Sequence, residues 1–292
     1  MKKLVIGSRD SRLALEQAEY VRRGLALLHP DIAFEIKTYK TKGDRILDRT
    51  LESIGGKGLF TRELELALLA GEADLLVHSL KDMPAEPDGR IPIAAVSPRE
   101  DARDVLVLPE GKRELSGPIG TASPRRALQL ARLYPGHEIR PVRGNVPTRL
   151  QKLDSGEYGA LCLAAAGLRR LGLEGRISRI FETDEMLPAA CQGTLAIQTR
   201  ADFDKTLLLG FCDENNLLAA RCERSFVRTL GGGCTSPSAA YAETDGETLT
   251  LRGLYAAPDG SVHTGTECGS AADAGKIGER LALRLMRRAE NG

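Results

Sequence analysis

Strand and helix patterns alternate from residue 3 to about residue 200, and this alternation limits the fold more than any other feature of the 292-residue chain. Short apolar runs, such as residues 75–77, are typical of buried strands. Longer segments with helical spacing separate them, as at residues 61–70. Such alternation predicts an α/β fold with a mostly parallel sheet covered by helices.

The first helix is expected to begin after a Ser11 cap and to end near Leu28. Its apolar residues predict one buried face. The residues expected on that face are Leu13, Leu15, Val21, Leu25 and Leu28.

Two irregular segments, residues 97–101 and 187–193, interrupt the alternation and suggest that the chain leaves its first domain and later returns to it. After residue 215 the pattern changes. A helix is predicted over 215–230, then three strands separated by Asp-Gly turns at 245–246 and 259–260, then a helix over 271–288. We expect three domains: residues 1–96 with 194–211 (α/β), residues 100–190 (α/β), and residues 215–292 (α+β, with a three-stranded antiparallel sheet).

Composition excludes several classes of protein. The formal net charge is +1 and the chain has no tryptophan, which argues against a nucleic-acid-binding protein. No apolar run approaches the ~20 residues that span a bilayer. The apolar run after Lys3 is too short for a signal peptide, so a cytoplasmic location is expected.

The six cysteines and four histidines lack metal-ligand spacing, so no metal is expected. Cys162, within an apolar run, is predicted to be buried.

Cys234 follows three glycines and precedes Thr235-Ser236-Pro237. Glycines leave a thiol unshielded and permit positive φ, and the proline prevents a helix from continuing. The pattern predicts an open loop that presents one sulfur. Taken alone, the pattern favours the simpler alternative of a tight turn that happens to contain a cysteine.

Positive charge is concentrated between Lys112 and Lys152, where nine basic residues face two acidic ones. The segment 120–126 predicts a strand end, a turn and a helix N-terminus, and the segment 143–149 repeats this order. Helix N-termini that follow strands bind anions, and arginine pairs well with carboxylates. We therefore expect an anionic ligand, although a solvated basic face would give the same composition.

Two further segments contain charged residues that are candidates for a functional site. Asp82, in His78-Ser79-Leu80-Lys81-Asp82, comes directly after a buried strand and is a candidate general acid/base or cation-stabilising group; a turn-capping aspartate is the simpler alternative. Residues 55–58 (Gly-Gly-Lys-Gly) lack the Ser/Thr of a nucleotide-binding loop. They are expected to form a flexible loop over a cleft or a simple connector.

Together these segments resemble the hydroxymethylbilane synthase (porphobilinogen deaminase) family along nearly the whole chain. The shared motifs are Arg9-Asp10-Ser11, Thr41-Lys42-Gly43-Asp44, Gly55-Gly56-Lys57-Gly58-Leu59-Phe60, His78-Ser79-Leu80-Lys81-Asp82, Gly120-Thr121-Ala122-Ser123 with Arg125-Arg126, Arg143-Gly144-Asn145-Val146, Ala166-Gly167-Leu168 with Arg170, Gln192-Gly193, and Gly232-Gly233-Cys234.

The resemblance implies a monomeric transferase of porphyrin (heme) biosynthesis with two periplasmic-binding-protein-like (type II) domains and a smaller C-terminal domain. It would join four porphobilinogen molecules head to tail, with loss of ammonia, onto a dipyrromethane cofactor held through a thioether by Cys234, and release hydroxymethylbilane by hydrolysis. Asp82 would be catalytic. Cofactor contacts are implied for Ser79, Lys81, Thr121, Ser123, Arg125, Arg126, Arg143 and Gly144. Substrate contacts are implied for Arg9, Ser11, Lys57, Phe60, Arg149, Arg170 and Gln192.

Three residues depart from the family pattern: Arg12, Ala122, and Cys191, which stands where glycine is common. The alternative to an enzyme is a non-enzymatic, two-lobed binding protein for an anionic metabolite, which would share the arginines but gives no role to Cys234. No membrane or nucleic-acid partner is expected.

Overall fold

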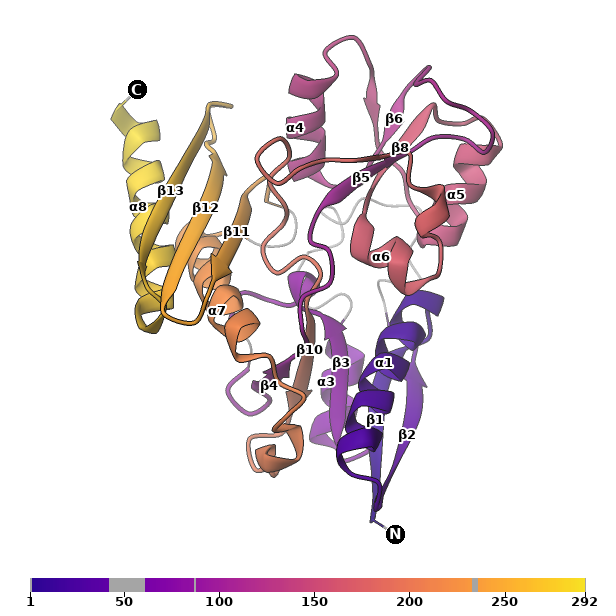
Figure 1. The fold of residues 1–292 in the computed structure, drawn as a ribbon, viewed down its shortest axis with the longest axis vertical. Coiled ribbons are helices and arrows are strands. Elements are labelled where there is room, and N and C mark those ends of the chain that lie inside the picture. The colour runs from indigo at the N-terminus through magenta and orange to yellow at the C-terminus, as the bar shows by residue number, and fades with distance from the viewer. Residues whose placement is uncertain (1, 42–60, 87, 233–235, 292) are drawn as a thin grey trace. The chain divides into compact units, whose positions relative to one another are not determined.

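The computed structural model describes residues 2–41, 61–86, 88–232 and 236–291 (Figure 1). The chain divides into two compact units. One consists of Met1–Arg99 and Thr194–Leu218, and the other of Glu100–Gly193 and Ala219–Gly292. Each unit is built around its own sheet or sheets, and we describe the two separately.

The first unit contains a five-stranded sheet of order β2-β1-β3-β10-β4. Its strands are β1 (Lys2–Arg9), β2 (Ile32–Tyr39), β3 (Leu75–Ser79), β4 (Ile93–Val96) and β10 (Leu195–Thr199), and its helices include α1 (Arg12–Leu28) and α3 (Arg62–Leu69). β1 runs parallel to β2 and β3, whereas β10 is antiparallel to β3 and β4. Four of the five strands therefore run in the same direction, which confirms the prediction of a mostly parallel sheet. The sheet is mixed because the returning chain enters β10 in the opposite direction.

Helix α1 begins and ends close to its predicted limits, but the predicted buried face was only partly right. Ala14, Val21 and Leu25 are buried, and the latter two join the core of the sheet. Leu15 and Leu28 are 37% and 42% exposed. Small alanines on the face that carries Val21 and Leu25 allow the helix to lie close to the sheet. This close packing, rather than the number of leucines on a face, determines which side of the helix is buried.

The α/β part of the second unit repeats this topology. Its sheet has the order β7-β6-β8-β5-β9. The strands are β5 (Asp104–Val107), β6 (Ile119–Gly120), β7 (Ile139–Arg140), β8 (Ala160–Ala164) and β9 (Arg179–Ile180), and the helices are α4 (Pro124–Leu133), α5 (Val146–Asp154) and α6 (Ala165–Arg170). β6 is parallel to β7 and β8, and β5 is antiparallel to β8 and β9. Cys162 is fully buried in this core, as predicted.

The C-terminal part of the second unit is a three-stranded antiparallel sheet of order β11-β12-β13 with two helices. Its elements are α7 (Glu214–Thr229), of which residues 219–229 belong to this unit, β11 (Ala239–Thr244), β12 (Thr248–Ala256), β13 (Val262–Ser270) and α8 (Ala274–Asn291). Gly278 of α8 allows a close helix contact, since a Cβ there would lie 2.2 Å from the carbonyl oxygen of Cys222 in α7. Two mixed α/β sheets and a C-terminal antiparallel sheet confirm the predicted fold class.

Short 3-10 helices connect several elements: η2 (Leu80–Asp82), η3 (Glu174–Arg176), η4 (Lys205–Leu208) and η5 (Ala271–Asp273). Among the described residues, no helix combines the length and apolar character needed to cross a bilayer.

Candidate functional site

In the first unit, polar residues follow the carboxyl end of β3. The chain turns through η2, and the Leu80 side chain, 1% exposed, anchors this turn in the core. The Leu80 N–H donates to the carbonyl of Thr194 at 3.0 Å, which ties the turn to the segment before β10. Asp82 is exposed and Lys81 is half-buried. The turn therefore presents a carboxylate to solvent from a rigid base.

Hydroxyl groups near this turn have internal partners. The Ser79 hydroxyl lies 3.0 Å from the side-chain nitrogen of Gln17, a buried residue of α1. Ser11 accepts a bond from the Ala14 N–H at 3.4 Å and so caps α1. Arg9 is half-buried at the end of β1. β1 and β3 are neighbouring parallel strands, so their polar ends share one edge of the sheet.

His78 is buried within β3, 6% exposed. Burial lowers the pKa of its imidazole to about 4. The side chain is therefore neutral near pH 7 and contributes no positive charge toward an anionic ligand.

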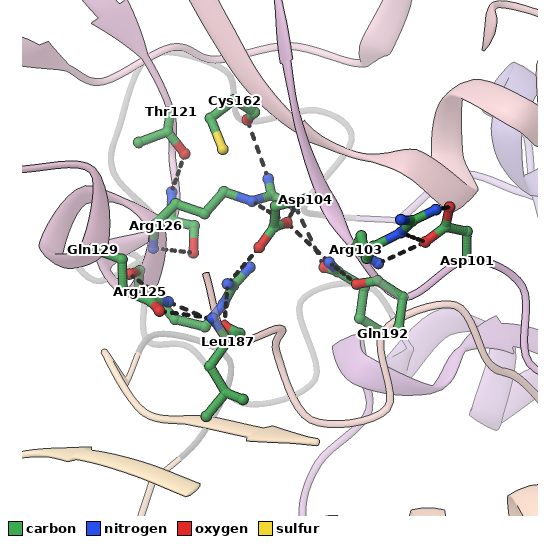
Figure 2. Close-up of polar contacts among 12 residues, drawn as sticks. Asp101, Arg103, Asp104, Thr121, Arg125, Arg126, Gln129, Cys162, Leu187 and Gln192 are labelled. Atoms are coloured by element: carbon green, nitrogen blue, oxygen red, sulfur yellow. Dashed lines mark hydrogen bonds and ion pairs between the residues drawn. The ribbon is translucent and has the colours of Figure 1, made fainter. Parts of the chain in front are cut away.

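In the second unit, Arg125 and Arg126 are both buried and converge on Asp104, as Figure 2 shows. Arg125 Nη1 lies 2.6 Å from Asp104 Oδ2, and Arg126 Nε lies 2.8 Å from Asp104 Oδ1. Burial alone would raise the pKa of Asp104, but the two guanidinium charges and the hydrogen bonds outweigh it and hold that pKa well below its usual range. Two buried cations thus share one buried anion.

Two glutamines complete this cluster (Figure 2). Gln192 Nε2 donates to Asp104 Oδ1 at 2.9 Å and to the Ala102 carbonyl at 2.7 Å, and its Oε1 accepts from Arg126 Nη2 at 3.3 Å. Gln129 exchanges hydrogen bonds with the Leu187 backbone at 2.8 and 3.0 Å. Gln192 is 1% exposed. In this arrangement its side chain orients the charges of the cluster.

The predicted strand-turn-helix pattern is present at both arginine motifs. Helix α4 follows β6, with Ser123 as its N-cap and proline in its first turn. Helix α5 begins after Asn145, which caps it in the same way. The Thr121 hydroxyl accepts from the Ser123 N–H at 3.3 Å. Both helix N-termini are therefore positioned at the sheet edge where the sequence predicted an anion site.

The remaining predicted residues contact backbone carbonyls or lie half-buried. Arg149 Nε donates to the Gly144 carbonyl at 2.7 Å, and Gly144 has φ +112°, a conformation that favours glycine. Arg170 Nη2 donates to the Gly193 carbonyl at 2.6 Å. Arg143 is half-buried. Cys234, Lys57 and Phe60 lie outside the described residues.

Asp104 is the central residue that sequence reasoning missed. It precedes the apolar run of β5 and is separated from its arginine partners by 21 and 22 positions. A charge at the first position of a fully buried strand was a usable signal, because a buried carboxylate requires a partner.

Two sheets of one topology, each with polar side chains beyond its parallel strands, define an α/β protein suited to anionic ligands. Family models identify it further. Residues 4–208 match "Porphobilinogen deaminase, dipyromethane cofactor binding domain", and residues 217–287 match "Porphobilinogen deaminase, C-terminal domain". The chain therefore belongs to the porphobilinogen deaminase family.

Relatives agree with this assignment. The chain is 51% identical over 290 residues to the porphobilinogen deaminase of Acetivibrio thermocellus, covering 99% of both chains. It is 48% identical to that of Chromobacterium violaceum, covering 98% of this chain and 95% of the relative.

Among solved structures it is similar to the methionine-binding protein MetQ, with TM-score 0.44 and 10% identity over 76% of this chain and 94% of that one.

Proposed function

We propose that this protein is the transferase that joins four porphobilinogen molecules head to tail, with loss of ammonia, onto a covalently bound dipyrromethane, and releases hydroxymethylbilane by hydrolysis. Family membership and the match of residues 4–208 to a dipyrromethane-binding domain support this function. The observation that carries it within the structure is the buried pair Arg125 and Arg126, with a single carboxylate between them.

The residues fit this cofactor. Each of its two pyrrole rings carries an acetate and a propionate, so it needs cationic and N–H donors. Arg125, Arg126 and Asp104 together leave one positive charge in a buried cluster, where charge is weakly screened. The capped N-termini of α4 and α5 add backbone N–H donors. When bound, the cofactor supplies the pyrrole carbon to which the first substrate is joined.

Cys234 is the proposed attachment point, and Asp82 is the proposed catalytic carboxylate. Loss of ammonia leaves an electron-poor carbon next to the pyrrole ring. In its protonated form, an exposed carboxyl group on an anchored turn can donate a proton to the leaving amine. The carboxylate that remains can stabilise positive charge and accept the proton released on bond formation, which restores the acid. Lys81 and Ser79, beside it, are proposed to contact the carboxylates of bound pyrroles.

The arginines at the strand ends are proposed to hold the acidic chain as it lengthens. Arg9, Arg149 and Arg170 are each half-buried. Bonds to the backbone carbonyls of Gly144 and Gly193 hold Arg149 and Arg170 in place. A hydrogen bond to a charged group contributes about 1.5–3 kcal/mol. Loss of one such arginine should stall elongation without unfolding the protein. A cytoplasmic location and a monomeric state belong to the same proposal.

The experiment that tests this function is the intact mass of protein purified from cells that make porphobilinogen. The wild-type protein should exceed its sequence mass by one dipyrromethane and should give the aldehyde colour reaction of pyrroles. Cys234→Ala should lose both signals. Cys268→Ala is the matched control, because Cys268 is exposed and free, on β13, and should keep both.

The same measurement separates the proposed enzyme from a non-enzymatic protein that binds an anionic metabolite. Such a protein would have the sequence mass, would release its ligand on denaturation, and would not convert porphobilinogen. Unmodified wild-type protein without turnover would refute the enzyme function and favour the binding protein.

A further inference from the structure

A buried carboxylate, Glu223, connects helix α7 to two other segments of the second unit. It is fully buried. Its Oε2 accepts from the Cys191 N–H at 2.5 Å, and its Oε1 accepts from the Ala242 N–H at 2.6 Å. Each oxygen has a different backbone donor, one in the segment that precedes β10 and one in β11. A carboxylate suits this position because both of its oxygens accept hydrogen bonds.

Cys191 is the one residue other than glycine with positive φ among those the structure describes, at φ +61°. L-residues disfavour this conformation, since Cβ crowds the backbone. The side chain of Cys191 is also buried, and its Sγ lies 3.9 Å from the Ala220 carbonyl of α7. The backbone at this position is therefore held in an uncommon conformation by bonds from α7.

The next residue is Gln192, whose side chain bonds Asp104, Ala102 and Arg126. The direction of the Gln192 side chain depends on the backbone conformation of residues 191–192. A change of φ at Cys191 would rotate Gln192 away from the Asp104 carboxylate and remove a hydrogen bond to Arg126. Glu223 thus acts on the arginine pair through two covalently linked residues.

We propose that Glu223 is a positioning residue. It holds the Cys191 peptide in its left-handed conformation, so that Gln192 orients Asp104 and Arg126 for the carboxylates of the bound pyrroles. This inference rests on the proposed function and adds a role for α7. That helix ends at Thr229, five positions before Cys234. The helix that leads to the attachment cysteine therefore also sets the arginine cluster.

The test uses four variants of the full-length holoenzyme: Glu223→Gln, Cys191→Gly, the double variant, and Glu214→Gln as control. An amide has one acceptor oxygen, so Glu223→Gln leaves one backbone N–H facing an NH₂ group. Glycine adopts positive φ freely, so in Cys191→Gly the bond from Glu223 is no longer needed to hold this backbone conformation. Glu214 is an exposed residue of the same helix, and its variant should behave as wild type.

We expect Glu223→Gln to raise the KM for porphobilinogen about tenfold, to reduce kcat by a smaller factor, and to lower the fraction of chains that carry the cofactor by intact mass. The glycine variant alone should stay within about twofold of wild type. In the double variant the KM increase should fall to about threefold or less. An equal KM increase in both backgrounds, or wild-type KM and cofactor loading in Glu223→Gln, would refute the inference.

A second variant covers the case in which Glu223→Gln does not fold. Cys191→Val keeps Glu223 but places a β-branched residue at positive φ, which such residues strongly disfavour. It should raise KM by a factor similar to that of Glu223→Gln, and wild-type KM would refute the inference. Failure of the proposed function is distinguishable, because wild-type protein would then show neither attached cofactor nor turnover.

Discussion

The two five-stranded sheets share one strand order, but the charged groups beyond their strands differ in burial. In the first unit the turn after β3 presents Asp82 to solvent. In the second, Arg125 and Arg126 lie inside the protein around Asp104. Under the proposed function, this difference in burial corresponds to two roles within one repeated topology: an accessible carboxylate for proton transfer in one sheet, and a fixed positive charge for binding in the other.

Asp82→Asn is the substitution with the largest expected effect on turnover. The amide keeps the size of the side chain but cannot transfer the proton, so kcat should fall about 10²–10⁴-fold. Because Asp82 is exposed, the unfolding curve of the Asp82→Asn variant should match that of wild type. Single-turnover consumption of porphobilinogen and thermal unfolding measure the two properties. Glu86→Gln, an exposed carboxylate on the same connection, is the control, and an equal loss of rate there would remove the special role of Asp82.

Asp104→Asn tests the opposite side of the comparison, because it should act on stability. Removing one partner from a buried ion pair costs about 3–5 kcal/mol, since the remaining charges are left uncompensated. The control is Asp154→Asn, which breaks a 2.7 Å pair with Arg176 nearer the surface and should cost less than about 1 kcal/mol. Chemical denaturation of both variants measures the difference, and equal costs would show that the cluster is not electrostatically special.

The Asp104 cluster also predicts a pH dependence with a defined sign. The folded-state pKa of Asp104 lies well below the unfolded value of about 3.9. Its contribution to stability is therefore complete above about pH 4 and is lost as the pH falls toward the folded pKa. Asp104→Asn should lack this acid-dependent part of the unfolding free energy.

The first unit should respond to acid at higher pH through His78. Burial lowers the pKa of His78 to about 4, against an unfolded value of about 6.5. The unfolded state therefore takes up the proton first, and stability falls as the pH drops from 6.5 to 4. A difference of this size corresponds to about 3 kcal/mol. His78→Gln should flatten the unfolding free energy across this window, and an unchanged slope would show that another group controls it.

Much of the fold could be predicted from residue patterns because its elements are locally encoded. The helix predicted over 215–230 is α7, Glu214–Thr229, and the two Asp-Gly turns join β11, β12 and β13. Gly246 and Gly260 take the positive φ values that such turns require. In these segments local turn chemistry and apolar periodicity agree with the tertiary structure.

The arginine cluster could be predicted only in part, because it depends on contacts distant in sequence. The motif 120–126 correctly indicated a strand end and a helix N-terminus, but Gln192 reaches Asp104 across 88 positions. The positive φ of Cys191 could not be predicted from the sequence either. Its φ of +61° is a conformation that glycine adopts more readily than cysteine.

The smallest expected effect sharpens the contrast between buried and exposed arginines within the basic segment. Arg140 also belongs to that segment, but it is exposed and pairs with Glu138 at 2.8 Å on the surface. That bond raises the pKa of Arg140, yet an exposed pair of this kind is largely screened by water and salt. Arg140→Gln should therefore leave the unfolding midpoint, the KM for porphobilinogen and cofactor loading indistinguishable from wild type. If Arg140→Gln weakened binding as strongly as a buried-arginine variant such as Arg126→Gln, the total charge of the segment, rather than the fixed geometry around Asp104, would control recognition.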